Sequence, residues 1–273
     1  MTKLEFFDTH CHIQDIKSSP DGDKMMHEKW QKAGITDESQ VIESAKKEGV
    51  NRLLVVGCTL GDSKMAVDLA AKHENVWAAI GIHPHESEDH NTNAHLEEFA
   101  DLAKKPKVVA IGECGLDFYY NNSPRKHQIE LLKFQLKLAE KHDLPVVFHV
   151  RDAFDEFFEI FDKFKGIRGV IHSFTANEKI LSECLKRSLY IGLNGITTFT
   201  KVDDQLAAIK KVPSDKLLLE TDAPFLTPTP YRGTICEPKH VVHTATFLAE
   251  LRQENLADLA AQTTKNAREL FNV

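Results

Sequence analysis

The sequence predicts an α/β fold: a single (β/α)8 barrel with an extra C-terminal helix. Eight short apolar runs alternate with amphipathic helical segments, which is the pattern of parallel strands joined by helices. The composition does not change along the 273 residues, a length that is normal for one such barrel. Polar side chains follow several strands at their C-terminal ends, which a barrel gathers at one mouth. We therefore expect one domain over residues 1–273.

The predicted strands are short runs rich in aliphatic and β-branched residues, several of them closed by glycine, proline or a polar residue. The first begins at Leu4 and carries two histidines at its end. In order, the runs cover 4–12, 51–57, 76–83, 108–113, 145–150, 169–172, 189–193 and 216–222.

The predicted helices lie between these runs and after the last one. Ser123 and Pro124 resemble a cap and first-turn pair at the start of the longest helix. Phenylalanines at helical spacing in 153–164 indicate a face that packs in the core. Residues 13–35 are expected to form a loop. The helices cover 37–48, 62–73, 94–103, 123–142, 153–164, 177–186, 202–210, 239–252 and 256–270.

A doubly wound open sheet is the alternative fold. It would spread the polar strand ends along one edge of the sheet, whereas a barrel brings them together. The barrel is favoured because six strands end in such residues.

Composition limits the compartment and the partners. Hydrophobic residues make up 42% and charged residues 27%, and no run of about 18 apolar residues predicts a membrane span. No apolar signal-peptide core precedes the first strand, so we expect a cytoplasmic protein without a membrane partner. The five cysteines are odd in number and form no C-x-x-C pair, which favours reduced thiols.

The formal net charge of −7 argues against a broad basic surface that binds duplex nucleic acid. It does not exclude an enzyme that acts on nucleic acid. Bound divalent cations would offset acidic residues locally, and a small pocket needs to hold only a few phosphates.

The end of the first strand carries the first candidate metal ligands, His10 and His12. Side chains alternate faces along a strand, so these two imidazoles project to the same side and can share one ion. Later strand ends add matching donors: Glu113, His149, His172 and Asp222. Imidazole and carboxylate ligands together suit Zn, Mn, Fe or Mg.

Six donors exceed the three protein ligands of a typical single-zinc catalytic site, and they suit two ions bridged by a carboxylate. We expect one ion on His10, His12 and Asp222, a second on His149 and His172, and Glu113 as the bridge. Such a site activates water for attack on an electrophile. Asp222 is the candidate general base, so Glu113 and Asp222 are the predicted catalytic residues.

Five ordered motifs then point to one family. The chain resembles the TatD family of metal-dependent deoxyribonucleases, within the amidohydrolase-like barrels, through 8–12, 81–85, 112–119, 172–174 and 220–224. The resemblance implies a TIM barrel, a site for divalent metals such as Mg, Mn or Zn, and removal of nucleotides from the 3′ ends of single-stranded DNA. Family members are also linked to RNA trimming and to repair of oxidised DNA.

The same resemblance assigns roles to individual residues. It implies the six metal ligands already named, and it places His83 near the substrate phosphate. Arg151 and Arg232 are similar to phosphate contacts, a task that suits a planar guanidinium. Glu220 is two residues from Asp222 and is expected either to contact substrate or to orient a metal ligand by a hydrogen bond.

The chain departs from the family pattern at two positions. Cys236 precedes Glu-Pro where the family commonly has asparagine, and Ala176 ends a segment where glycine is frequent. We expect both departures to affect the fit of substrate more than the binding of metal.

Two other functions stay open. A related hydrolase could cleave amides or lactones with the same metals, although many such barrels bridge their ions with a modified lysine rather than a residue such as Glu113. A barrel that only binds other molecules is the second alternative, and the presence of all six ligands argues against it. The expected partner is nucleic acid, with no obligate protein partner evident.

Overall fold

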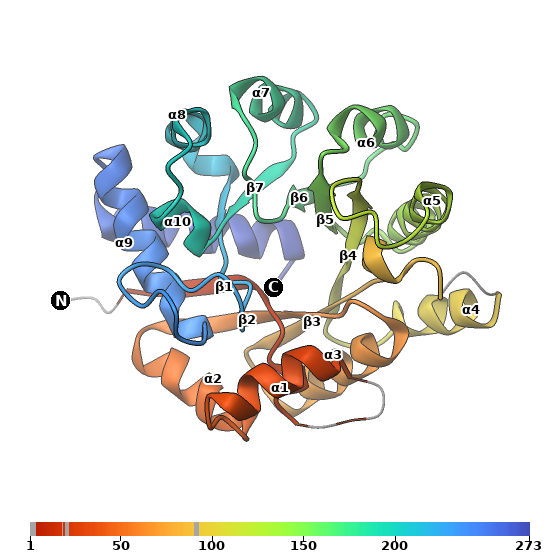
Figure 1. Cartoon of the computed structure of the whole chain (residues 1–273), viewed down its shortest axis with the longest axis horizontal. Helices are drawn as coiled ribbons and strands as arrows, with labels where there is room; N and C mark the ends of the chain where they lie inside the picture. Colours follow the sequence, from red (N-terminus) through yellow and green to blue (C-terminus); the bar gives the residue numbers. More distant parts are fainter. Residues whose placement is uncertain (1–3, 18, 20–21, 90–92) are drawn as a thin grey trace. The chain divides into compact units, whose positions relative to one another are not determined.

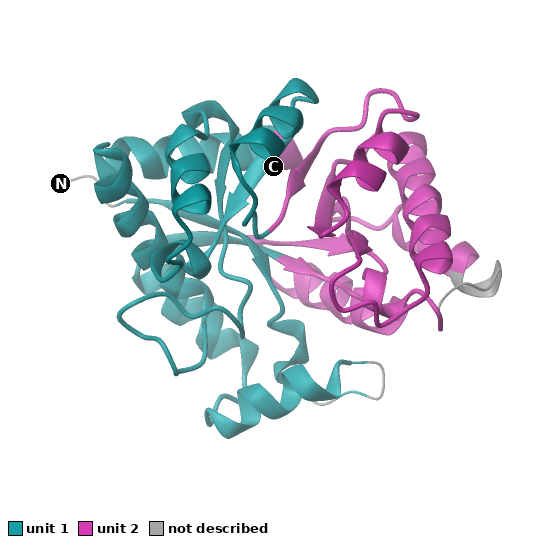
Figure 2. Ribbon diagram, turned by 45° about the horizontal axis from the view of Figure 1, so that its top comes forward, with its two compact units in different colours: residues 1–54, 173–269 teal, residues 55–172, 270–273 magenta. Residues whose placement is uncertain are grey.

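The structure is a computed structural model that describes residues 4–17, 19, 22–89 and 93–273. The chain divides into two compact units (Figure 2). Unit 1 comprises residues 1–54 and 173–269, and unit 2 comprises residues 55–172 and 270–273.

Among the described residues, eight strands are present where the sequence predicts them, each within a few residues of the expected bounds. In the sheet they follow their order along the chain, and the strand pairs of each unit are parallel. This order is that of a (β/α)8 barrel, whereas a doubly wound sheet reverses its strand order at a switch point. The strands are β1 (Phe6–Cys11), β2 (Val50–Val56), β3 (Val76–Ile80), β4 (Val108–Asp117), β5 (Val146–Arg151), β6 (Gly169–Ile171), β7 (Tyr190–Leu193) and β8 (Leu217–Leu219).

All nine predicted helices are present, and a C-terminal helix follows the one after β8, as expected. The α-helices are α1 (Lys24–Lys32), α2 (Glu38–Lys47), α3 (Leu60–Lys72), α4 (Asn93–Leu102), α5 (Arg125–His142), α6 (Phe154–Phe161), α7 (Glu178–Lys186), α8 (Asp203–Lys211), α9 (Val241–Arg252) and α10 (Leu256–Phe271).

In unit 1, β7 pairs with β8, and the chain beyond β8 continues beside β1. The backbone N–H of Asp222 donates to the carbonyl of His10 at 2.8 Å, and that of His12 donates to the carbonyl of Ala223 at 2.7 Å. Helix α9 packs against β1 and β8. These bonds fix the end of β1 next to the segment that carries Asp222.

In unit 2, β3, β4, β5 and β6 pair in that order. Helix α3 packs on β3 and α5 packs on β4 (Figure 1). The ring of Phe148 on β5 lies 4.9 Å from that of Phe157 and 5.8 Å from that of Phe161 on α6, measured between centroids. All three rings are buried, which confirms that the phenylalanine-rich helix packs in the core.

Two local predictions are wrong. Residues 13–35 are not only a loop, because they contain a 3-10 turn at Gln14–Ile16 and helix α1. Asp23 caps α1 by accepting from the backbone N–H of Met26, and Trp30 anchors the helix with no exposed surface. With Met26 and Trp30 as its only buried residues, α1 has a short apolar face that gives little periodicity to detect.

The second error concerns the start of α5. The helix begins at Arg125, with Pro124 in the cap position and no side-chain cap bond. The hydroxyl of Ser123 instead donates to the carbonyl of His85 at 2.6 Å. A tertiary partner has therefore replaced the local capping interaction.

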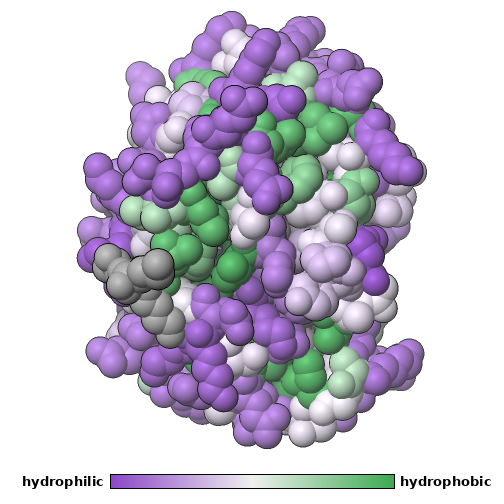
Figure 3. Space-filling model, turned by 90° about the vertical axis from the view of Figure 1, so that its left-hand side faces the viewer, coloured by the Kyte–Doolittle hydropathy of each residue, from purple (hydrophilic) through white to green (hydrophobic). Residues whose placement is uncertain are grey.

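Within the described part of the chain, no helix combines the length and the apolar character needed to cross a membrane. Figure 3 shows one face of the molecule, on which hydrophilic residues predominate and hydrophobic residues form smaller groups between them.

Candidate metal centre

Unit 1 brings together the first three predicted ligands, His10, His12 and Asp222, which we call the β1/β8 cluster. Nε2 of His10 lies 3.2 Å from Nε2 of His12, and Oδ1 of Asp222 lies 3.3 Å from the latter and 3.8 Å from the former. Both histidines are almost fully buried, whereas the carboxylate of Asp222 is 17% exposed. The donor atoms therefore converge on one point that solvent reaches from the side of Asp222.

The backbone at the end of β8 sets the position of Asp222. Its φ is +63°, a left-handed conformation that costs a non-glycine residue about 1–3 kcal/mol and that aspartate tolerates better than most. Hydrogen bonds on both sides hold it: its N–H donates to His10, and its carbonyl accepts from Phe225 at 2.8 Å.

Asp8 connects the segments that carry the cluster through three hydrogen bonds. Its carboxylate accepts from the backbone N–H of Thr221 at 2.8 Å, from the Thr221 hydroxyl at 2.6 Å and from the backbone N–H of His10 at 3.3 Å. Complete burial raises the pKa of Asp8 to about 8, although these hydrogen bonds favour the charged form. Asp8 thus connects β1 to the segment before Asp222.

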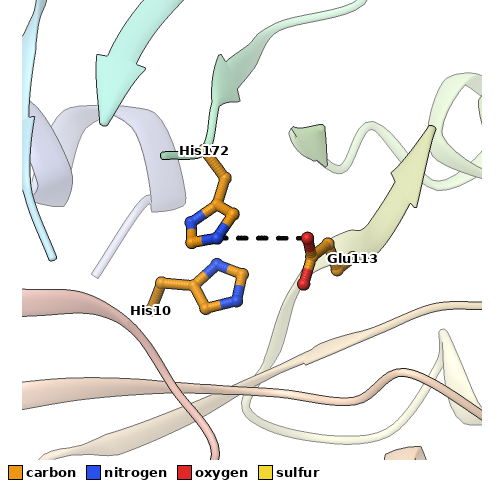
Figure 4. A group of neighbouring side chains, drawn as sticks. All are labelled: His10, Glu113 and His172. Atoms are coloured by element: carbon orange, nitrogen blue, oxygen red, sulfur yellow. Dashed lines mark ion pairs between the residues drawn. The ribbon is translucent and has the colours of Figure 1, made fainter. Parts of the chain in front are cut away.

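Unit 2 holds a second group of donors around Glu113 on β4, which we call the β4/β5 cluster. Oε1 of Glu113 lies 2.8 Å from Nδ1 of His149, 3.6 Å from Nε2 of His83 and 4.0 Å from Nε2 of His172. Figure 4 shows the imidazole of His172 facing the carboxylate of Glu113. The other oxygen of Glu113, Oε2, lies 4.0 Å from Sγ of Cys58.

A buried carboxylate that the sequence left ambiguous, Asp117, fixes the ring of His149. Its Oδ2 lies 3.0 Å from Nε2 of His149 and 3.0 Å from Nε2 of His85. Its Oδ1 accepts from the backbone N–H groups of Tyr119 and Tyr120 at 3.0 and 2.9 Å. One carboxylate therefore orients two imidazoles and the turn that follows β4.

These contacts shift the pKa values of the cluster in opposite directions. Burial opposes the charged form of His149, but its hydrogen bonds to Asp117 and Glu113 raise its pKa to about 9. Burial opposes the charged form of Asp117 too, yet hydrogen bonds from His149 and His85 hold its pKa far below the usual range. For His83, burial and the neighbouring His149 lower the pKa well below 6.5, so this ring is neutral.

The predicted substrate-binding residues have different environments. The guanidinium of Arg151 is exposed and lies against the rings of Tyr119 and Tyr120. Arg232 is also exposed; its guanidinium lies over the ring of Phe199 and donates to the carbonyl of Thr227.

Glu220, in contrast, is 1% exposed, and its carboxylate accepts from the backbone N–H of Ser173, the residue after His172, at 2.6 Å. Asn194 donates to the hydroxyl of Ser173 at 2.9 Å. The geometry therefore places Glu220 against the backbone of the His172 segment.

Sequence reasoning gave less weight to Asp117 and His85 than their contacts justify. The predicted strand ended at residue 113, whereas β4 extends to Asp117. In the longer strand Glu113 and Asp117 are separated by an even number of residues and share one face, a spacing that could have indicated the role of Asp117. Cys236, the departure from the family pattern, is fully buried, and burial raises the pKa of its thiol.

The donor sets fit divalent ions. Ligand bonds of about 2.0–2.1 Å place two donors on one ion about 2.9–3.4 Å apart at octahedral to tetrahedral angles. Two of the three separations in the β1/β8 cluster, 3.2 and 3.3 Å, lie in this range, and the third, 3.8 Å between His10 and Asp222, exceeds it. Imidazole nitrogen and carboxylate oxygen are also the donors that Zn and Mn accept.

Comparison with known proteins gives a consistent result. The family model described as TatD related DNase matches residues 7–272. The metal-dependent hydrolase YabD of Bacillus subtilis (strain 168) is 35% identical over 98% of this chain and 99% of its own length. The 3′-5′ ssDNA/RNA exonuclease TatD of Escherichia coli (strain K12) is 37% identical over 87% of this chain and 94% of its own length.

Among solved structures, YJJV, a TatD homolog from Escherichia coli K12, has a TM-score of 0.85, with 29% identity and 98% of both chains covered. A TatD family hydrolase from Entamoeba histolytica has a TM-score of 0.84 at 21% identity, which supports the fold alone. The predicted barrel fold is confirmed. Since the family model spans residues 7–272, this chain belongs to the TatD-related DNase family.

Proposed function

We propose that this protein is a metal-dependent deoxyribonuclease that hydrolyses phosphodiester bonds from the 3′ ends of single-stranded DNA, and that it also accepts RNA. The observation that carries the proposal is the convergence of His10, His12 and Asp222, whose donor atoms lie within 4.8 Å of one another. Relatives that are 37% identical over most of the chain carry the name of 3′-5′ ssDNA/RNA exonucleases.

The proposed site holds two divalent ions, Mg, Mn or Zn. His10, His12 and Asp222 would hold one ion, His149 and His172 the other, and Glu113 would bridge them. Two groups of donors support this proposal: His10, His12 and Asp222 form one, and His83, Glu113 and His149 form another. These donors lie in the C-terminal parts of their strands or within a few residues after them, on the side where barrel enzymes keep their active sites. When bound, divalent ions would lower the pKa of water and neutralise negative charge on the phosphodiester.

The protein's own groups would move the proton and orient the ligands. Asp222 would accept a proton from the attacking water, and the partial exposure of its carboxylate supports this role. Asp117 would hold the ring of His149 by accepting from one of its nitrogens, which leaves Nδ1 toward Glu113. Glu220 would fix the backbone beside His172 through Ser173.

Cationic and neutral groups would bind the phosphate. Arg151 and Arg232 are exposed and carry planar guanidinium groups suited to phosphate oxygens. His83 is neutral and lies beside Glu113, so we assign it a hydrogen bond to the phosphate next to the cleaved bond.

We further propose that the whole chain acts as one catalytic domain in the cytoplasm.

The deciding experiment is degradation of end-labelled single-stranded DNA after chelation, with Mg, Mn or Zn restored one at a time. We expect a ladder that shortens from the 3′ end only when metal is present, and titration calorimetry should give two ions per chain. His149→Ala should remove the activity and keep the fold, whereas His73→Ala, at the end of α3, should leave the activity unchanged. Cleavage of amides or lactones in place of DNA would refute the nuclease assignment.

A further inference from the structure

Two adjacent tyrosines follow β4, and both stand open to solvent. Tyr119 is 58% exposed and Tyr120 is 54% exposed, which places them among the most exposed large hydrophobic side chains in the described part of the chain. Their rings lie 4.9 Å apart between centroids and nearly perpendicular, at 89°. Rings packed in this way contribute little to the core, because more than half of each side chain contacts water.

A guanidinium accompanies the two rings. The Cζ atom of Arg151 lies 4.3 Å from the ring centre of Tyr119 and 4.7 Å from that of Tyr120. The register of the sheet explains the contact, since Asp117 on β4 stands opposite Arg151 on β5. The exposed group therefore offers aromatic faces and one positive charge side by side.

The same group is joined to the β4/β5 cluster by hydrogen bonds. Asp117 accepts from the backbone N–H groups of Tyr119 and Tyr120 through Oδ1 and contacts His149 through Oδ2. His149 in turn lies 2.8 Å from Glu113. The ring of Tyr120 also makes an edge contact with His85, at 5.6 Å between centroids. The tyrosines are thus fixed to the carboxylate that orients a proposed metal ligand.

A nucleobase suits this combination of groups. Every base has a flat π face that stacks on aromatic side chains without regard to sequence, and arginine beside the rings can pair with the phosphate. Stacking of this kind needs a base whose face is free, which a duplex covers and a single strand offers.

We propose that Tyr119 and Tyr120 form a stacking platform for bases of the single-stranded substrate, next to the cleaved end, with Arg151 binding the phosphate of the stacked nucleotide. This inference rests on the proposed nuclease function and adds to it the groups that select unpaired strands. Tyr119 and Tyr120 act by positioning the strand; the proton transfers stay with the groups around the metal site.

The test replaces both tyrosines by leucine, which keeps apolar bulk and removes the π face, and compares this variant with the matched double phenylalanine variant. The bonds to Asp117 come from the backbone and survive both changes. We expect Tyr119→Leu/Tyr120→Leu to raise KM for a single-stranded octanucleotide about tenfold with kcat changed less than twofold, since one lost stack is worth about that factor. The Tyr119→Phe/Tyr120→Phe variant should retain the wild-type KM within about twofold.

An octanucleotide with abasic sites at its 3′ end completes the cycle. For the wild type, KM on this strand should rise by about the same factor as the leucine substitutions cause. For the leucine variant, KM should be almost the same on the abasic and the intact strand, because the two changes remove the same contact. Additive losses, or an unchanged KM in the leucine variant, would overturn the platform.

The failure of the platform can be told from the failure of the proposed function. If the wild type cleaves no strand with any metal, the nuclease assignment fails. Binding of a labelled dT octanucleotide, followed by fluorescence anisotropy, still decides the platform in that case. Weaker binding by the leucine variant and wild-type binding by the phenylalanine variant would support it, and equal binding by all three proteins would refute it.

Discussion

Asp117 shows how much one buried carboxylate can control at the scale of a residue. It accepts from two backbone N–H groups with one oxygen and contacts two imidazoles with the other. Its own side chain has no exposed surface. It therefore acts on the proposed metal site through His149 and not by direct contact with substrate.

Asp117→Asn should separate these two tasks. The asparagine oxygen can still accept from Tyr119 and Tyr120, but its amide cannot accept from His149. We expect metal affinity in titration calorimetry to fall about 10- to 100-fold, the usual effect of losing such a partner, with the far-UV circular dichroism unchanged. Asp155→Asn removes the same charge from the exposed surface of α6 and should leave the affinity unchanged. Wild-type affinity in Asp117→Asn would contradict the role of Asp117.

A second residue, His240, links stability to pH. Its Nδ1 accepts from the backbone N–H of Glu237 at 3.1 Å in a capping box, and its ring stacks on Tyr231. Burial, with help from Lys239 and His243, lowers its pKa to about 4. The unfolded chain, with a histidine pKa near 6.5, therefore binds a proton that the folded protein excludes between about pH 6.5 and 4.

The proton that folded His240 excludes makes acid destabilise the fold. Stability from this group is present above about pH 6.5 and is lost as the pH falls, by up to about 3 kcal/mol near pH 4. His240→Gln keeps the capping hydrogen bond, because glutamine is a natural residue at this position of a capping box, and it removes the titration. Urea unfolding at pH 7 and pH 4.5 should show a smaller loss of stability in His240→Gln than in the wild type. Equal losses would assign the acid sensitivity to other groups.

At the scale of an element, Trp30 is the largest buried side chain that anchors helix α1. Trp30 has no exposed surface, and its indole N–H donates to the carbonyl of His12 at 3.2 Å. The helix therefore packs beside the end of β1, where the predicted ligands His10 and His12 lie.

Trp30→Ala should lower the free energy of unfolding by about 3–5 kcal/mol, because it leaves a cavity and removes the hydrogen bond that the indole N–H donates. Met25→Ala, on the same helix but 57% exposed, should change stability by less than about 0.5 kcal/mol. Denaturant titration measures both variants. Similar small losses in the two variants would show that α1 is not anchored through Trp30.

At the scale of the whole molecule, charge limits how nucleic acid is held. The formal net charge is −7, and the proposed phosphate contacts are two arginines, Arg151 and Arg232. For single strands each neutralised phosphate contributes about 0.7 to the slope of log affinity against log salt, so we expect a slope near about −1.4.

Binding of single-stranded DNA over a range of salt concentrations checks this prediction. Arg151→Ala should reduce the slope by about 0.7, whereas Arg151→Lys should retain it because the charge remains. A slope steeper than about −4 would show that a wider basic surface takes part.

The sequence by itself determined the barrel class and which donor residues are candidates for the metal site. Alternation of side chains along a strand is a local property, so His10 and His12 could be assigned to one face without any tertiary information. The strand-to-helix pattern is also local, and it located β4, β5 and β8 within a few residues, together with the polar groups in or after their C-terminal parts.

Only the tertiary structure decided how groups distant in sequence combine. The register between β4 and β5 sets Asp117 opposite Arg151 in the sheet, and the guanidinium of Arg151 lies against the rings of Tyr119 and Tyr120. Likewise, Ser123 contacts His85 instead of capping α5, and α1 forms because Trp30 finds a buried site. Such outcomes depend on packing between separate segments, which no local pattern of residues encodes.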